Sequence, residues 1–286
     1  MSEKPLRVRF APSPTGHVHL GSARTALYDY LIAKQTGGQF ILRIEDTDRN
    51  RYITGAEEEL IQGLHWLSID WDEGPDKGGV FGPYRQSERK ETYLQYARQL
   101  IEMGHAYYSF CSSERLNAVR EEMRKEKKPF LYDGLCRDIP LQEAEKRIAN
   151  GESYVIRFKT AKEGETIVHD LLRGEISFPN KTLDDYIIVK TDGWALYHLA
   201  ATVDDHLMQI THVIRGSEWL PTSPLHHQIW QAFGWDEPAW VHLSVFLKPS
   251  GKGKMSKREA AELSNDGYSI FIKDLEELGY LPEAVI

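Results

Sequence analysis

The segment 12–22 combines residue types that suit the binding of a phosphate group. It follows a short alternating run and precedes a run with helical periodicity, so it forms a turn at a helix N-terminus. Such a terminus offers unpaired backbone N–H groups and the positive end of the helix dipole. Gly16 and Gly21 let a ligand approach the backbone, and the imidazoles of His17 and His19 can donate to phosphate oxygens. Taken alone, the segment is also compatible with an ordinary turn that carries two solvated histidines.

A second motif that suits phosphate chemistry lies near the end of the sequence. Segment 248–258 carries lysine and arginine but no acidic residue, and Gly251 and Gly253 give its backbone freedom. Mobile cations can neutralise the charge that develops on a transferring phosphoryl group. A basic run of this kind is also typical of a solvated surface loop. The residues of the motif are Lys254, Met255, Ser256, Lys257 and Arg258.

The elements around the first motif form a strand–helix–strand unit. Alternation predicts a strand at 6–10, and the spacing of apolar residues predicts a helix at 20–34. A second strand at 39–44 delivers the acidic residues Glu45 and Asp46 at its carboxyl end. Strand, helix and strand in this order are typical of an α/β fold with a parallel sheet.

After this unit, the pattern of the sequence predicts an α+β block in the middle of the chain and then a return to alternating strands and helices. Asp192 and Gly193 predict a tight turn before segment 194–199. After the last helix, residues 280–286 are too few to complete another element. The other expected helices are 57–67, 88–103, 114–128, 140–150, 224–233 and 270–278, and the other expected strands are 154–158, 185–189, 212–215 and 241–247.

The composition excludes several classes of protein. With 286 residues, 41% of them hydrophobic and 27% charged, the chain lies in the globular range and suits about two domains. The net charge of −8 means that any nucleic-acid binding would depend on a local basic patch. Two cysteines exclude a disulfide scaffold. No apolar signal segment and no apolar run of membrane-spanning length occur, so we expect a cytoplasmic protein without membrane contacts.

The two phosphate-binding motifs together resemble the paired signature of class I aminoacyl-tRNA synthetases. Further segments resemble the glutamyl-tRNA synthetases of that class, from about residue 7 to the last residue. The resemblance implies ATP-dependent activation of L-glutamate to glutamyl-adenylate and transfer of the glutamyl group to the 3′-terminal ribose of tRNA(Glu). It also implies that ATP and Mg²⁺ bind at the carboxyl ends of a Rossmann-type sheet. The segments are 9–16, 43–49, 82–89, 203–208 and 213–216.

The resemblance assigns the phosphate chemistry to His19, Gly21, Lys254 and Lys257, which we expect to be the catalytic residues. Catalysis would then consist mostly of placement and electrostatics, because the substrate carboxylate is already a nucleophile. The expected ATP site comprises His17, His19, Gly21, Ser22, Glu218, Lys254, Met255, Ser256, Lys257 and Arg258.

Selection of glutamate needs a cation for the side-chain carboxylate and an anion for the α-ammonium group. Arg9 and Arg215 offer the fork of donors that suits a carboxylate, and Glu45 suits the ammonium group. Outside the resemblance, Arg215 could equally form a rim salt bridge, and Trp219 could belong to the core. Ala201 departs from the family, which often has Asn, Ser or Cys there. The expected glutamate site comprises Arg9, Ala11, Ser13, Glu45, Tyr197, Ala201, Arg215 and Trp219.

The resemblance also implies a Rossmann catalytic domain that is split by an insertion. We expect the two catalytic halves at 1–105 and 194–247, and an inserted α+β domain that binds the acceptor stem of tRNA at 106–193. Residues 248–286 would comprise the loop with the second motif and the start of a truncated stem-contact region.

Some relatives carry a zinc knuckle in this insertion. The corresponding residues here are Ser109, Cys111, Tyr132 and Cys136, so one thiolate is missing. Three protein ligands that include a tyrosine make a poor closed tetrahedral site. We therefore expect two unbridged thiols and no metal.

Two other functions fit parts of the sequence. A short paralogue that glutamylates the queuosine base of tRNA(Asp) has about this length, but the intact second motif and segment 82–89 follow the full-length enzymes. A non-enzymatic tRNA-binding remnant would show no glutamate-dependent exchange between ATP and pyrophosphate. We expect the chain to be a monomer.

Overall fold

A parallel pair of strands joined by a helix forms the N-terminal part of the fold. The computed structural model describes residues 5–48, 51–247 and 269–286. Strand β1 (Arg7–Phe10) pairs in parallel with β2 (Gln39–Leu42), and helix α1 (Leu20–Thr36) connects them. Gly37 ends this helix in the left-handed region, with φ of 64°, where a side chain would be strained. The strand–helix–strand unit is therefore confirmed.

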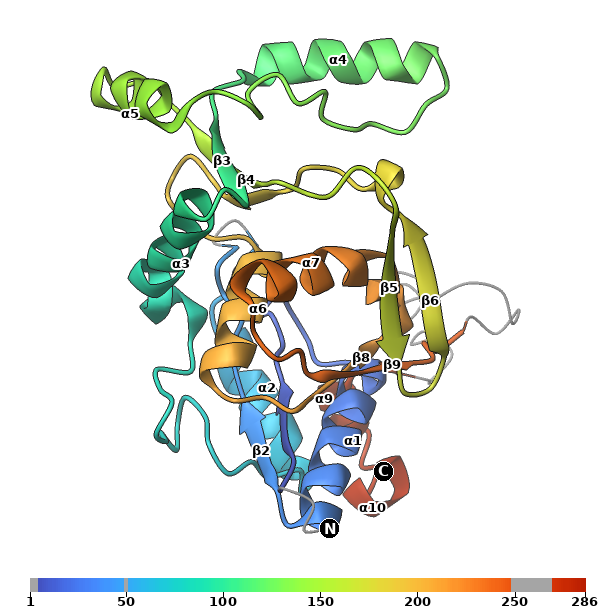
Figure 1. Cartoon of the computed structure of the whole chain (residues 1–286). Coiled ribbons are helices and arrows are strands. Elements are labelled where there is room, and N and C mark those ends of the chain that lie inside the picture. Colours follow the sequence, from blue (N-terminus) through green and yellow to red (C-terminus); the bar gives the residue numbers. More distant parts are fainter. Residues whose placement is uncertain (1–4, 49–50, 248–268) are drawn as a thin grey trace.

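A second parallel pair repeats this arrangement (Figure 1). Helix α7 (Ser223–Phe233) connects strand β8 (His212–Gly216) to strand β9 (Ala239–Leu243), and the two strands are parallel. The first pair lies next to the second, because the Thr211 N–H donates to the Arg7 carbonyl over 2.9 Å. The α/β class with parallel strands therefore agrees with the prediction.

An antiparallel hairpin that the sequence analysis missed extends the second pair. Strands β5 (Glu165–Asp170) and β6 (Gly174–Pro179) pair along their length, and β5 also pairs in parallel with β9 at Asp170 and Trp240. The resulting strand order is β6-β5-β9-β8. The hairpin lies within the segment expected to form the insertion, yet it shares a sheet with β8 and β9. The domain boundaries themselves stay a prediction.

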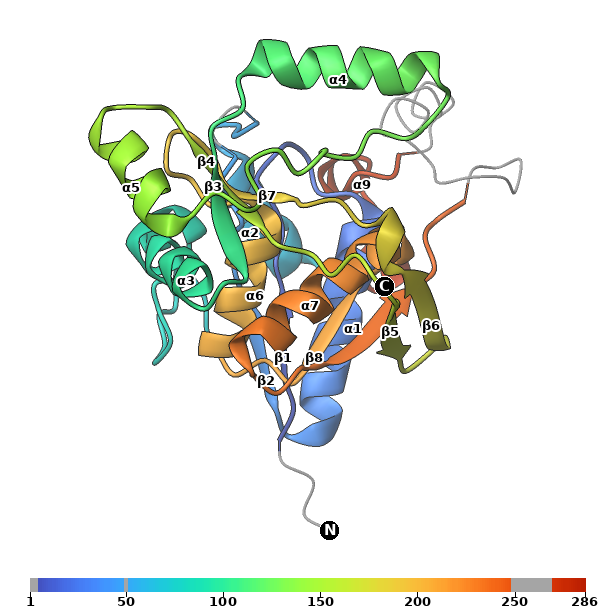
Figure 2. The ribbon, with the colours of Figure 1, turned by 45° about the horizontal axis from the view of Figure 1, so that its top comes forward.

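A separate antiparallel sheet lies beyond the parallel strands. It consists of β3 (Ala106–Ser109), which was not predicted, β4 (Val155–Phe158) and β7 (Ile187–Val189), in the order β3-β4-β7. Helices α4 (Ser113–Lys125) and α5 (Leu141–Ala149) lie on its outer side, at the top of Figure 1 and again in the turned view of Figure 2. No residue of helix α4 is fully buried, and Leu116 is half-buried against Tyr132 and Cys136.

Helix α6 (Tyr197–Leu207) was not predicted, and it begins shortly after the tight turn. The turn forms, with Gly193 at φ of 76°, and Ala195 makes a single bridge to β7. From Tyr197 onward, however, segment 194–199 becomes helical. Leu199 and Val203 of this helix are fully buried. Burial of this apolar face favours a helix.

The remaining elements differ from the prediction mainly at their ends. Strand β2 ends at Leu42 instead of residue 44, and β9 covers 239–243 instead of 241–247. A short helix, α10 (Pro282–Val285), forms where no further element was expected. The other helices are α2 (Ala56–Trp66), α3 (Lys90–Glu102) and α9 (Ile272–Glu277), and the 3₁₀ turns are η1 (Gln86–Arg89), η2 (Asn180–Thr182) and η3 (Ser217–Thr222).

Two apolar clusters hold these elements together. The first joins α1, β1, β2 and α2 and contains the fully buried Phe40 and Leu64. The second joins α3, the antiparallel sheet, α6 and α7 and contains Tyr93, Phe158 and Leu199. Within the described ranges, no helix is both long enough and apolar enough to cross a membrane.

Helix α6 also carries two adjacent carboxylates in the interior, Asp204 and Asp205. Asp204 is fully buried and accepts hydrogen bonds from Arg89 Nε at 2.7 Å, Gln86 Nε2 at 2.9 Å and the Tyr93 hydroxyl at 2.8 Å. Burial raises the pKa of Tyr93, and the charge of Asp204 raises it further. These bonds tie α6 to η1 and α3.

Replacement of Asp204 should destabilise the fold strongly. The change Asp204→Ala leaves the buried guanidinium of Arg89 without its carboxylate, which costs roughly 3–5 kcal/mol. The free energy of unfolding in urea should fall by that amount. The control Asp192→Ala removes an exposed carboxylate that pairs with Lys190, and should change stability by less than about 1 kcal/mol. Similar losses in both variants would contradict the role given to Asp204.

Candidate active site

A chain of buried charges at the ends of β1 and β2 positions Arg9 and Glu45. Arg9 donates through Nε and Nη2 to the two carboxylate oxygens of Asp205, at 2.9 and 3.2 Å. Arg43 donates to Asp205 at 2.7 Å and to Glu45 Oε1 at 3.0 Å. Burial would raise the pKa of Asp205, but Arg9 and Arg43 outweigh it and lower the pKa. Asp205 is therefore an ionised anchor for both guanidinium groups.

Glu45 keeps one side of its carboxylate open. Among the described residues it takes a single hydrogen bond, from Arg43 to Oε1, and its side chain is 7% exposed. Burial raises its pKa, and the charges of Arg43 and Arg9 offset only part of this effect. A cation placed against Glu45 would therefore be bound in a desolvated setting, where charge interactions are strong.

Arg215, at the end of β8, is a buried guanidinium whose hydrogen-bond partners are neutral groups. Its Nε donates to His242 Nε2 at 2.9 Å, and its Nη2 donates to the Ser223 hydroxyl at 3.0 Å. Its Nη1 lies 3.2 Å from the Tyr197 hydroxyl and 3.4 Å from His226 Nε2. Within the described ranges, no carboxylate forms an ion pair with it.

Tyr197 brings the two halves of the site together. The charges that act on its hydroxyl are those of Arg215, Glu45 and Arg9, and burial raises its pKa. Its ring lies 4.7 Å from the ring of Trp219, which is 39% exposed. Residues that are far apart in the sequence thus surround one place: Arg9 and Glu45 on one side, and Arg215 and Trp219 on the other.

His19 caps the N-terminus of α1 with its own ring. Its Nδ1 accepts the Ser22 N–H at 3.2 Å, and Nε2 lies 3.2 Å from the Ser22 hydroxyl. A Cβ at Gly21 would lie 2.9 Å from the His19 ring, which is too close for ordinary packing. This position therefore requires glycine, because only a residue without a Cβ leaves room for the capping imidazole.

The other expected site residues lie in more open positions. His17 is exposed, and its Nδ1 lies 2.6 Å from Glu59 Oε1. Ser13 and Glu218 are exposed, and the Glu218 carboxylate folds back over Gly216. Ala11 is half-buried and Ala201 is buried. The residues that fall outside the described ranges are Lys254, Met255, Ser256, Lys257 and Arg258.

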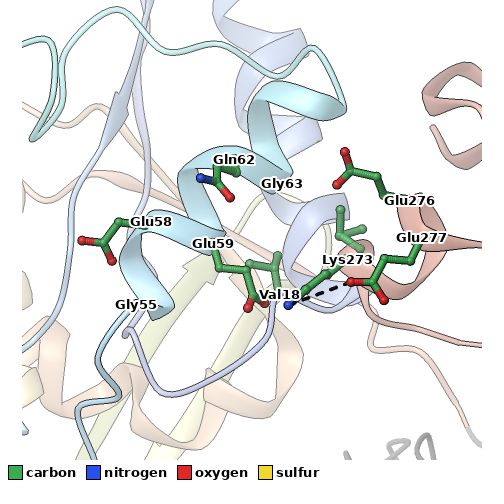
Figure 3. A pocket seen from close by; sticks show the side chains of 10 residues that line it. Val18, Gly55, Glu58, Glu59, Gln62, Gly63, Lys273, Glu276 and Glu277 are labelled. Atoms are coloured by element: carbon green, nitrogen blue, oxygen red, sulfur yellow. Dashed lines mark ion pairs between the residues drawn. The ribbon is translucent and has the colours of Figure 1, made fainter.

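A cavity of about 520 Å³ lies between α2 and α9, and Val18 of the first motif also lines it (Figure 3). Glu58 and Glu59 line it from α2, and Glu276 and Glu277 line it from α9. Lys273, also in its wall, lies 4.0 Å from Glu277. The acidic lining would repel the phosphates of a nucleotide.

No metal centre is formed by the described part of the chain, where no three His, Cys, Asp or Glu side chains come close enough to share an ion. Cys111 and Cys136 are free thiols whose sulfur atoms lie 3.5 Å apart. The Tyr132 hydroxyl lies 3.3 Å from Cys111, and the Ser109 hydroxyl lies 3.4 Å from Tyr132. The residues of the expected degenerate knuckle are therefore brought together.

Sequence reasoning missed the groups that hold the site residues in place. Asp205 and Arg43 lie in segments that the analysis singled out, yet it gave them no role. The two adjacent acids of segment 203–208 were the available signal, because neighbouring buried carboxylates require cationic partners. His226 and His242 gave no such signal, since histidine in a predicted apolar helix or strand has no specific pattern.

Comparison with known proteins places this geometry in a family. The model of the catalytic domain of class I tRNA synthetases for glutamate and glutamine (E and Q) matches residues 5–286. The chain belongs to this family. The resemblance drawn from the spaced motifs is thereby confirmed, and the Rossmann-type sheet follows from the family.

Individual relatives agree with this assignment. The chain is 50% identical to a glutamate–tRNA ligase of Amoebophilus asiaticus, over 99% of this chain and 59% of the relative. It is 47% identical to that of Christiangramia forsetii, over 100% of this chain and 60% of the relative. A glutamate tRNA ligase of Elizabethkingia meningosepticum, solved in complex with its amino acid, superposes with a TM-score of 0.91 at 45% identity, over 98% of this chain and 59% of that one. The chain thus spans less than two thirds of these relatives.

Asp29, on α1 beside the charge chain, gives a test of the electrostatics. It is fully buried, and within the described residues neither carboxylate oxygen has a hydrogen-bond partner. Burial raises its pKa well above the usual value, although the charge of Arg9 acts in the opposite direction. The folded state therefore binds this proton more tightly than the unfolded state does.

The wild-type chain should accordingly lose stability, relative to Asp29→Asn, as the pH rises above the ordinary carboxyl pKa of about 3.9. Between that value and the raised pKa of the folded state, the difference should grow by at most about 1.4 kcal/mol per pH unit. Urea unfolding of both proteins between pH 4 and pH 8 measures it. A constant difference across this range would show that Asp29 does not titrate abnormally, and the exposed change Asp192→Asn serves as the control.

Proposed function

We propose that the chain activates L-glutamate with ATP to form glutamyl-adenylate, and that the glutamyl group then passes to tRNA(Glu). The observation that carries this proposal is the buried Arg215, whose partners are all neutral. A buried charge needs a counter-charge to offset its desolvation, and the side-chain carboxylate of glutamate supplies one. The family membership and the relatives named as glutamate–tRNA ligases support the same reading.

The amino acid would lie between the two halves of the site. Arg215 would bind its side-chain carboxylate, assisted by the Nη1 group of Arg9, which Asp205 leaves without a hydrogen bond. The open side of Glu45 would bind the α-ammonium group. Tyr197 lies among these groups. The remaining walls of the pocket are assigned to Ala11, Ser13, Ala201 and Trp219.

ATP would bind across the N-terminus of α1. His19, Gly21 and Ser22 would contact the nucleotide there, with His17 and Glu218 at the margin. An oxygen of the glutamate α-carboxylate bonds to the α-phosphorus of ATP, and the bond to the β-phosphate oxygen breaks, so pyrophosphate leaves. We assign Lys254 and Lys257, with their neighbours in the second motif, to the charge on the phosphates. The Mg²⁺ ion would be held largely by the phosphates and water, as is usual for this ion.

The tRNA would contact the antiparallel sheet and the helices on its outer side. We assign the acceptor end to the inserted segment 106–193, between the catalytic segments 1–105 and 194–247, and a stem contact to 248–286. In the transfer step, a ribose hydroxyl of the terminal nucleotide attacks the glutamyl carbonyl, and AMP leaves.

The change Arg215→Ala tests the proposed site. It should raise the KM for glutamate by at least about 100-fold, because loss of one partner of a buried ion pair costs roughly 3–5 kcal/mol. The KM for ATP should stay nearly constant. Glutamate-dependent exchange between ATP and pyrophosphate, measured with and without tRNA(Glu), gives both constants.

The control Arg98→Ala removes an exposed guanidinium on α3, outside the segment assigned to tRNA, and should leave both constants unchanged. Equal weakening of glutamate and ATP by Arg215→Ala would make Arg215 a structural residue. Exchange that is absent in the wild type under both conditions would refute the proposed activity.

The change Gly21→Ala tests the assignment of the α1 turn to ATP. The added Cβ displaces the His19 ring, so the maximal exchange rate should fall by about 10-fold or more. This fall corresponds to a rise of about one to two kcal/mol in the activation free energy. Helix propensity favours alanine by roughly 0.5–1 kcal/mol, so the melting temperature should not fall steeply. The control Thr36→Ala alters the exposed last turn of the same helix. An unchanged rate in Gly21→Ala would exclude His19 from catalysis.

A further inference from the structure

His242 stands between Arg215 and a buried carboxylate. Arg215 and His242 are register partners on the parallel strands β8 and β9, so their side chains lie on the same face of the sheet. His242 Nε2 lies 2.9 Å from Arg215 Nε, and His242 Nδ1 lies 2.7 Å from Asp170 Oδ2. Asp170 ends β5, the strand next to β9 (Figure 1). All three side chains are buried.

Two contacts fix the protonation of this imidazole. A guanidinium only donates hydrogen bonds, so the Nε2 atom that faces Arg215 must carry a lone pair. Asp170 is filled with donors: Oδ1 accepts the N–H groups of Leu172 and Arg173, and Oδ2 accepts the His242 backbone N–H. The Nδ1 atom that faces Oδ2 must therefore carry the proton. His242 is held as the Nδ1–H tautomer.

The imidazole is also neutral. Burial lowers the pKa of His242 to about 4, and the charge of Arg215 acts in the same direction, against the charge of Asp170. The carboxylate of Asp170 thus reaches Arg215 only through a neutral ring. A carboxylate placed directly against Arg215 would neutralise its charge and compete with an anionic substrate. A neutral acceptor instead holds the guanidinium in place without pairing with its positive charge.

We propose that His242 is a positioning residue for amino-acid recognition: fixed by Asp170, it orients Arg215 and preserves its charge for the side-chain carboxylate of the substrate. This inference rests on the proposed function, because it takes Arg215 as the group that binds that carboxylate. It adds that the hairpin β5–β6, which carries Asp170, supplies the anchor of the His242 ring. Orientation of a binding group by a second layer of hydrogen bonds is a general feature of precise sites.

Two substitutions of His242 separate its two contacts. In His242→Gln the amide oxygen lies where Nε2 was, so the acceptor for Arg215 is kept while the bond to Asp170 is lost. In His242→Asn the shorter side chain places its amide donor where Nδ1 was, so Asp170 keeps its partner and Arg215 loses its acceptor. The two variants are similar in polarity, and each serves as the control for the other.

His242→Asn should raise the KM for glutamate by about 10- to 100-fold, the usual consequence of leaving a buried charged donor unpaired. The kcat at saturating glutamate should change little, because the contact affects ground state and transition state alike. His242→Gln should stay within about threefold of wild type in KM. Glutamate-dependent exchange in the presence of tRNA(Glu) measures both, and thermal unfolding shows whether each variant is folded.

Equal KM values in the two variants would overturn the inference, and so would a loss confined to kcat. ¹⁵N-histidine NMR of the wild-type chain gives a test without mutation: the Nδ1 of His242 should show a protonated shift and Nε2 an unprotonated one, and the reverse would refute the positioning role. If Arg215→Ala itself leaves glutamate binding intact, the proposed function fails. If Arg215→Ala weakens glutamate but His242→Asn does not, only the role of His242 fails.

Discussion

The fold depends on two neighbouring carboxylates in the interior of helix α6. Asp204 and Asp205 face the guanidinium groups of Arg89, Arg43 and Arg9, which come from η1 and from the carboxyl-end region of the first two strands. Charges removed from water are tolerated only when they are paired and hydrogen-bonded. These contacts therefore fix where α6 lies against β1 and β2. The position of α6 in turn decides where Tyr197, in its first turn, stands relative to Glu45.

Arg215 differs from these arginines in the charge of its hydrogen-bond partners. Arg9 and Arg43 are matched by carboxylates of the chain itself, whereas Arg215 is surrounded by hydroxyl groups, imidazoles and the face of Trp240, 4.7 Å away. The neutral shell satisfies its hydrogen bonds without cancelling its charge. In the proposed function, this charge attracts the side-chain carboxylate of the substrate.

The hairpin β5–β6 shows how a peripheral element can act on the site. Asp170 lies at the end of β5, within the segment expected to contact tRNA, and its carboxylate holds the β5–β6 turn, the β9 backbone and the His242 ring at once. The segment that we assign to the acceptor end and the proposed amino-acid site therefore share one carboxylate. The buried Asp170 carboxylate accepts four N–H groups, so it has little freedom to move. It therefore couples the position of the β5–β6 turn to that of the His242 ring.

Local signals in the sequence were enough to predict the α/β class and the first strand–helix–strand unit, because hydrophobic periodicity and glycine punctuation act over short stretches of chain. The spacing of the motifs was enough to predict the family. It also named Arg9, Glu45, Tyr197 and Arg215, through the resemblance of the segments that contain them. Local patterns could not predict that α6 is a helix, that β5 and β6 join the strands β8 and β9, or that Asp205 and His242 contact arginines from distant segments. The physical reason is that burial and charge pairing act between residues far apart in the chain, such as Arg9 and Asp205, and no local pattern records which buried charge finds which partner.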